Sequence, residues 1–207
     1  MIYCTGDSHT SLFDGGMNAY DLKLSSYPAI GRKISGFATC HFGPVTAYGF
    51  TKHKCFGLLP KWVPPGSNLL VSAGEIDCRH YLLQEKFFNS NGIRSVAREC
   101  VARYLIGLVS LKKQGFNVGA LGPLHTPLAM PHMQPMGTIE QRFEMVLAFN
   151  GYLRGACHAN GLLYATLGNK VLRKEKYYFA WDGVHLSARA LPLIQGWEHL
   201  FDGFQKA

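Results

Sequence analysis

Residues 1–10 read MIYCTGDSHT, and the change from apolar to polar residues inside this stretch decides the fold. Residues 2–5 can form a short strand, and Gly6 ends it directly before an acid, a hydroxyl and an imidazole. In α/β proteins with a parallel sheet, ligands bind beyond the carboxyl ends of the strands. Ser8 therefore has two interpretations: it belongs to an ordinary strand end with an unreactive helix cap, or it is a nucleophile.

Apolar runs and helical periodicity alternate along the rest of the chain. Further strands are predicted at residues 68–73, 116–121 and 162–167, and residues 37–47 are predicted to hold a strand or a strand and loop, with Gly43-Pro44 as a break. Helices are predicted at 93–114, 138–158 and 188–204, with Thr138 as an N-cap and Gln141 at the capping-box spacing. Strands that alternate with helices predict an α/β fold with a parallel sheet. A length of 207 residues fits a single domain spanning 1–207.

The composition indicates a folded chain with a basic surface. Apolar residues make up 47% and charged residues 16%, which is enough to bury a core and argues against disorder. The net charge of +8 favours anionic partners, but the Lys and Arg residues are scattered and predict no specific nucleic-acid site. Every apolar run falls short of the roughly 18 residues that a membrane span needs.

The six cysteines occur at positions 4, 40, 55, 78, 100 and 157. Without a C-x-x-C pair they predict no zinc site, and several lie in apolar runs as buried free thiols do. The N-terminus shows no signal-peptide pattern, so a reducing, cytoplasmic compartment is expected. A secreted chain whose leader had been removed would look the same.

A second polar segment follows the last predicted strand. A serine hydroxyl needs a base to take its proton, usually a His that a carboxylate orients. Asp182 and His185 are three positions apart, which puts both side chains on one side of a turn. The pair alone is a weak signal, because Asp77 and His80 have the same spacing. Its position after the last strand, with Ser8 after the first, carries more weight.

The segments Gly6-Asp7-Ser8 and Asp182-Gly183-Val184-His185 resemble the first and last blocks of the SGNH (GDSL-type) hydrolases. This resemblance implies a three-layer α/β/α sandwich with a flavodoxin-like parallel sheet, and a Ser-His-Asp triad that needs no cofactor or metal. By match of motif, Ser8 would be the nucleophile, His185 the base and Asp182 the residue that orients it.

The resemblance also implies an oxyanion hole, and here the sequence departs from the family. The backbone N–H of Gly43 is the candidate for the second block, with Gly36 and Gly49 as rivals. The third block of the family is Gly-x-Asn-Asp, but this chain has Gly74-Glu75-Ile76-Asp77. Ile76 cannot donate a hydrogen bond, and loss of one oxyanion donor typically lowers the rate about 10²–10³-fold.

Four further side chains are candidates for oxyanion or substrate binding: Glu75, Asp77, Arg79 and His125. Arg79 is the nearest replacement for the missing donor, because its N–H groups can reach an oxyanion. In the alternative interpretation Glu75 and Arg79 form a structural ion pair. His125 follows a predicted strand and would line the cleft. The Met-rich stretch 130–136 is expected to be a loop near the cleft mouth.

The function expected from these residues is serine ester hydrolysis through an acyl-serine intermediate. The substrate would be a small molecule or polysaccharide, with an O-acetyl carbohydrate ester favoured. One alternative is a metal-dependent phosphoesterase with Asp7 and His9 as ligands. Another is a non-catalytic binding or assembly protein, which Ile76 favours. The sequence does not separate hydrolysis from acyl transfer and does not determine the oligomeric state.

Overall fold

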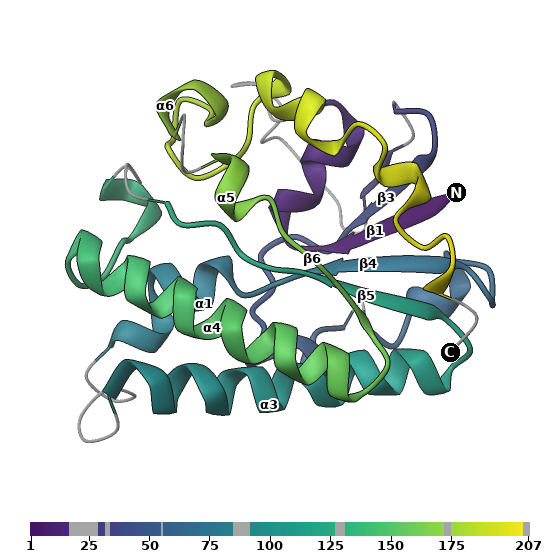
Figure 1. Cartoon of the computed structure of the whole chain (residues 1–207), viewed down its shortest axis with the longest axis horizontal. Coiled ribbons are helices and arrows are strands. Elements are labelled where there is room, and N and C mark those ends of the chain that lie inside the picture. Colours follow the sequence, from purple (N-terminus) through teal and green to yellow (C-terminus); the bar gives the residue numbers. More distant parts are fainter. Residues whose placement is uncertain are drawn as a thin grey trace.

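The computed structural model describes residues 1–16, 29–31, 34–54, 56–84, 92–126, 131–171 and 175–204. Within these residues six strands form one sheet in the order β2-β3-β1-β4-β5-β6 (Figure 1). They are β1 (Ile2–Gly6), β2 (Ala29–Gly31), β3 (Phe37–His41), β4 (Asn68–Ser72), β5 (Asn117–Leu121) and β6 (Leu163–Ala165). All neighbours are parallel except β2, which pairs antiparallel with β3 at one edge. The parallel strands follow the flavodoxin-like order, which confirms the predicted sheet.

The register aligns the carboxyl ends of the central strands. Gly6 is opposite His41 on one side and Ser72 on the other, and Ser72 is opposite Leu121. The segments that follow these residues therefore leave the sheet along one edge, where a parallel sheet is expected to bind its ligands.

Helical segments cover both faces of the sheet and complete three layers (Figure 1). One face packs against α1 (Glu75–Arg79), α3 (Gly92–Lys113) and α4 (Ile139–Ala159). The other packs against the 3₁₀ helices η1 (Ser8–Asp14), η7 (Ala188–Ile194) and η8 (Trp197–His199). The shorter segments are η2 (Phe50–Lys52), η3 (Leu59–Lys61), η4 (Tyr81–Leu83), η5 (Pro131–Met133), α5 (Gly168–Val171) and α6 (Glu175–Tyr178).

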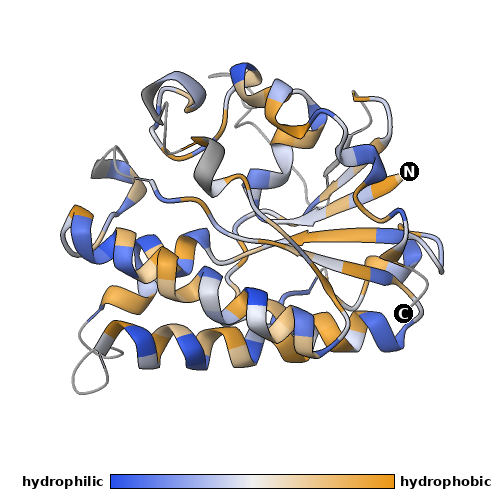
Figure 2. Ribbon diagram, viewed as in Figure 1, coloured by the Kyte–Doolittle hydropathy of each residue, from blue (hydrophilic) through white to orange (hydrophobic). Residues whose placement is uncertain are grey.

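Strand alternation explains why the sheet has a core on each side. Leu69 and Val71 of β4 pack into the cluster that holds Phe149 of α4, whereas Leu70 packs on the opposite face with Leu12 of η1. Successive side chains of a strand point to opposite faces, so a strand that is apolar throughout serves two cores. Figure 2 shows this hydrophobic character along β4 and β5, in the middle of the sheet.

The α4 helix begins where the sequence predicts. The Thr138 hydroxyl accepts a hydrogen bond from the Gln141 N–H at 3.2 Å, and the Gln141 side chain accepts one from the Thr138 N–H at 2.8 Å. These reciprocal bonds satisfy two backbone donors that a helix start otherwise leaves without partners. The capping box is therefore confirmed.

The prediction of one continuous helix over residues 188–204 is wrong. The segment instead forms the two 3₁₀ helices η7 and η8. Pro192 lies inside η7, and Gly196 adopts the left-handed conformation with a φ of 82°. Proline removes a backbone donor and glycine accepts positive φ readily, so together they interrupt an α-helix.

The cysteines agree with the expectation of free thiols. Cys4, Cys78, Cys100 and Cys157 are buried free thiols, Cys40 is also buried, and Cys55 lies outside the described residues. Of the helices that the structure describes, none combines the length and apolarity needed to cross a bilayer.

Candidate active site

The turn after β1 places Ser8 at the carboxyl edge of the sheet. Gly6 has a φ of 127°, and a Cβ there would lie 1.8 Å from the Ser72 carbonyl oxygen, so only glycine allows β1 and β4 to approach. The carboxylate of Asp7 accepts hydrogen bonds from the His9 N–H at 3.1 Å and the Ser72 hydroxyl at 2.8 Å. Asp7 therefore caps η1 and presents Ser8 at its first position.

The side chains of Ser8, His185 and Asp182 form a hydrogen-bonded chain, although Ser8 and His185 are 177 positions apart along the polypeptide. The Ser8 Oγ is 2.5 Å from His185 Nε2, and His185 Nδ1 is 2.5 Å from Asp182 Oδ2. The other carboxylate oxygen of Asp182 accepts the backbone N–H groups of Val184 and His185 at 2.9 and 3.0 Å. The turn after α6 thus holds the acid and orients the imidazole.

The charge state of Asp182 suits this arrangement. Burial opposes ionisation of its carboxyl, but the bonds to His185 and the backbone outweigh it and lower the pKa to about 2. An ionised carboxylate accepts the Nδ1–H of His185, which leaves Nε2 to accept the proton of Ser8.

A second polar network lies directly behind the imidazole. The His9 ring stacks on the His185 ring, with centroids 5.2 Å apart, and His9 Nε2 is 3.7 Å from Glu75 Oε2. Arg79 Nε donates to Glu75 Oε1 at 2.6 Å, so the predicted alternative of a Glu75–Arg79 ion pair is present. Burial would raise the pKa of Glu75, but His9 and Arg79 lower it to about 2. The buried anion in turn raises the pKa of His9, although burial alone would lower it.

Ser8 opens into a cleft of about 290 Å³. Of the three candidate glycines, Gly43 lines this cleft. Gly36 lies at the opposite end of β3, where its carbonyl accepts the Ile2 N–H, and Gly49 caps η2. Ile76 also lines the cleft. The segment Gly74–Asp77 therefore borders the site, but it contributes an apolar side chain where the related sequence block has an Asn. Arg79 contributes to the same lining while two of its nitrogens bond to Glu75.

Two predicted site residues, Asp77 and His125, do not line this cleft. Asp77 is fully buried, and its carboxylate accepts the Ala47 N–H at 2.7 Å and the Tyr48 N–H at 3.3 Å. Burial raises its pKa to about 6, although these bonds oppose the rise. His125 lines a separate cavity of about 240 Å³ beside α4. Both lie in segments that follow strands at the correct edge, but the packed fold places Asp77 against residues 47 and 48 and His125 in the separate cavity.

Truncation of Asp77 should test its structural role. We expect Asp77→Ala to lower the free energy of unfolding by about 1–3 kcal/mol, because the Ala47 N–H loses its buried acceptor. Asp77→Asn keeps a carbonyl acceptor and should destabilise less. Urea unfolding measures both variants, and equal stability of Asp77→Ala and wild type would contradict this role.

Four cleft residues were not singled out from the sequence: His41, His80, Tyr81 and His132. His41 ends β3, so the rule that ligands bind at the carboxyl ends of strands would have found it. His132 belongs to the Met-rich stretch 130–136, whose residues 132–134 line the cleft as expected; Met130 lies outside the described residues. His80 and Tyr81 follow α1, and their positions depend on how this short helix packs.

The described residues offer no metal-binding cluster. Within the described ranges, no three His, Cys, Asp or Glu side chains gather as metal ligands would. Asp7 and His9, the proposed ligands of the phosphoesterase alternative, instead contact Ser72, His185 and Glu75.

Comparison with known proteins identifies the fold. No family model and no curated protein matches the chain. A carbohydrate acetylesterase from Sinorhizobium meliloti is similar in structure, with a TM-score of 0.58, 14% identity, and 98% of each chain covered. A lipolytic protein of the G-D-S-L family from Veillonella parvula has a TM-score of 0.57 and 13% identity, covering 100% of this chain and 98% of that one. A lipase/acylhydrolase from Enterococcus faecalis has a TM-score of 0.53 and 15% identity, covering 98% and 95%. The chain therefore has the SGNH hydrolase fold.

Proposed function

We propose that this chain is a serine ester hydrolase that works through Ser8, His185 and Asp182. The observation that carries the proposal is the continuous contact from Asp182 Oδ2 through both ring nitrogens of His185 to Ser8 Oγ. Each contact is 2.5 Å, and the serine faces a cleft large enough for a small ester. This arrangement suits general-base activation of a serine hydroxyl.

The reaction would follow the chemistry of an acyl-serine intermediate. His185 takes the proton of Ser8 as its oxygen attacks the ester carbonyl, and Asp182 stabilises the imidazolium that forms. The imidazolium then gives the proton to the leaving alcohol. Water, activated by the same ring, releases the acyl group from Ser8. If an alcohol replaced this water, the same residues would perform acyl transfer.

The oxyanion hole would combine backbone and side-chain donors. We assign the backbone N–H groups of Ser8 and Gly43, and we place the imidazole of His41 in the role that Ile76 cannot perform. His41 lines the cleft with Ser8 and Gly43. Burial, together with the positive potential of His185 and His9, lowers its pKa to about 4. The ring is therefore neutral near pH 7 and carries one N–H that can donate.

Replacement of His41 should test this assignment. We expect His41→Ala to lower kcat by about 10²-fold with a small change in KM, because an oxyanion donor acts mainly in the transition state. His80→Ala, in the same cleft, serves as the matched control and should change kcat far less. Steady-state kinetics on both variants would count against His41 if the two effects were equal.

The size and lining of the cleft support the proposal of a substrate with a short acyl group on a carbohydrate. A volume of about 290 Å³ suits a small ligand. Aromatic planes border it: Tyr81 packs edge-on against His80, and Trp181 stacks on His132. Such planes suit sugar rings, and one similar structure is a carbohydrate acetylesterase. We therefore favour O-acetyl carbohydrate esters as substrates. The buried free thiols support a reducing, cytoplasmic location.

The test is an ester panel with two inhibitors. p-Nitrophenyl esters from acetyl to octanoyl, and an acetylated oligosaccharide, should show preference for acetyl groups. A serine-reactive phosphonate should label Ser8 stoichiometrically and stop turnover, whereas a chelator should have no effect. Loss of activity with chelator alone would favour the metal-dependent phosphoesterase. Absence of both turnover and labelling would favour a non-catalytic protein.

A further inference from the structure

The outer face of α4 exposes large apolar side chains in a regular row. Ile139, Phe143 and Leu147 are 49%, 36% and 53% exposed, and their four-residue spacing places them on one side of the helix. Leu147 forms a ridge between two hollows, of about 240 and 410 Å³, and Leu147 and Gly151 line both. A ridge beside hollows can pack against a surface of the same shape.

Two glycines continue this row, and the packing of the chain does not require them. A Cβ at Gly151 or Gly155 would meet no atom within 4 Å. Glycine inside a helix destabilises it relative to alanine. Both positions lie inside α4. Their small size is therefore better explained by a partner protein surface that packs on this face than by packing within the chain.

The charges on this face favour a second copy of the chain as the partner. Measured from position 149, Phe143 and Gly155 are equally distant, as are Leu147 and Gly151. Glu144 and Arg154 are also equally distant from it, as are Glu140 and His158. If two α4 helices pack antiparallel, Phe143 and Leu147 therefore each meet a glycine, Ile139 meets the small Ala159, and each of these acids meets a base.

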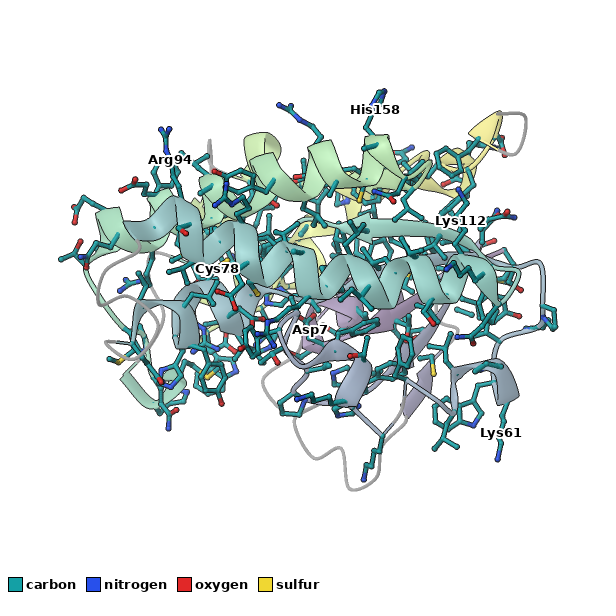
Figure 3. All side chains as sticks on the ribbon, turned by 90° about the horizontal axis from the view of Figure 1, so that it is seen from below. Asp7, Lys61, Cys78, Arg94, Lys112 and His158 are labelled. Carbon is teal, nitrogen blue, oxygen red and sulfur yellow. The ribbon has the colours of Figure 1, made fainter. Side chains whose placement is uncertain are left out.

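We propose that α4 forms a two-fold symmetric, antiparallel interface between two copies of this chain. The arrangement is isologous, so each contact occurs twice. Leu147 of each copy packs over Gly151 of the second copy, and Glu144 pairs with Arg154. In Figure 3 the His158 side chain points away from the ribbon on this side of the molecule, where it is available to the acid of the second copy.

One charge from a neighbouring helix must be considered in the test. Arg94 of α3 lines the same hollow as Glu144, so the acid also has a basic neighbour within one copy. A single charge reversal therefore affects the monomer as well as the interface. Exchange of both charges separates the two effects, because Glu144 and Arg154 lie about 15 Å apart along one helix and contact each other only between copies.

Sedimentation velocity over low to high micromolar concentration tests the interface without reference to catalysis. We expect wild type to form a dimer, and Leu147→Glu to raise its dissociation constant about tenfold or more. Ile106→Glu is the matched control, because Ile106 is 66% exposed but belongs to α3 and lines neither of the two hollows beside Leu147. A wild type that stays monomeric, or a dimer that survives Leu147→Glu, overturns the proposal.

Two further variants test the register. Gly151→Leu should abolish the dimer while the monomer melts no lower than wild type, because a Cβ at this position meets nothing within 4 Å and leucine favours a helix more than glycine does. Glu144→Arg and Arg154→Glu should each weaken the dimer, and the double variant should restore it. A double variant that remains monomeric, or a dimer that tolerates Gly151→Leu, contradicts this packing.

Discussion

Replacement of Ser8 by alanine should lower kcat/KM for an ester on the order of 10⁶-fold, the loss typical of a removed serine nucleophile. The reason is that Ser8 Oγ is the atom in contact with His185 Nε2, and no other hydroxyl in the described chain shares that contact. The side chain lies at the cleft and only partly inside the fold, so its truncation should leave the stability almost unchanged.

Ser11→Ala is the matched control, since it removes a hydroxyl from the same 3₁₀ helix. It should retain wild-type kinetics. Stopped or continuous assays of acetyl-ester hydrolysis measure both variants. Activity that persists in Ser8→Ala would end the proposal of a serine nucleophile, whereas equal losses in the two variants would indicate damage to η1.

Asp182→Asn should lower kcat about 10⁴-fold with the fold intact. An amide cannot accept the Nδ1–H of His185 and the two backbone N–H groups as the carboxylate does. It also offers an N–H₂ donor, which favours the tautomer whose Nε2 carries the proton and cannot accept one from Ser8. The imidazolium loses its anionic partner as well.

The chain contains a matched control for this change. Asp202 and His199 are also three positions apart and lie 2.9 Å from carboxylate to Nδ1, but each side chain is 72% exposed. Asp202→Asn should therefore leave kcat unchanged. If Asp182→Asn costs less than tenfold, Asp182 does not orient the base.

Much of the fold could be predicted because its signals are local. The strand that ends at Gly6, the apolar run before Gly74 and the capping box at Thr138 each depend on a few adjacent residues. The terminal segment after Ser187 was mispredicted, because its apolar spacing resembles a helix while Pro192 and Gly196 prevent one. In this segment the backbone preferences of proline and glycine, and not the apolar periodicity, determine the structure.

The site residues also divide into those that local sequence predicts and those whose positions depend on packing. Ser8, Asp182 and His185 were proposed as site residues because Ser8 directly follows the first strand and the Asp182–His185 pair lies between the last strand and the terminal segment. Asp77 and Glu75 share a short helix, yet one supports a distant turn and the other the stacked His9. Which way each points depends on how α1 packs against α4 and η4, and periodicity does not encode that.

The sequence by itself predicted the order of the parallel strands and main helices, the edge of the sheet at which ligands are expected, and the serine, histidine and aspartate that we propose as the triad. Only the tertiary structure decided that His41 lines the cleft, that the Glu75 carboxylate lies beside His9, and that Asp77 and His125 lie outside the cleft. The physical reason is separation along the chain. Strand and helix signals arise between neighbouring residues, whereas burial and polar pairing at the site join residues that only the packed sheet brings together.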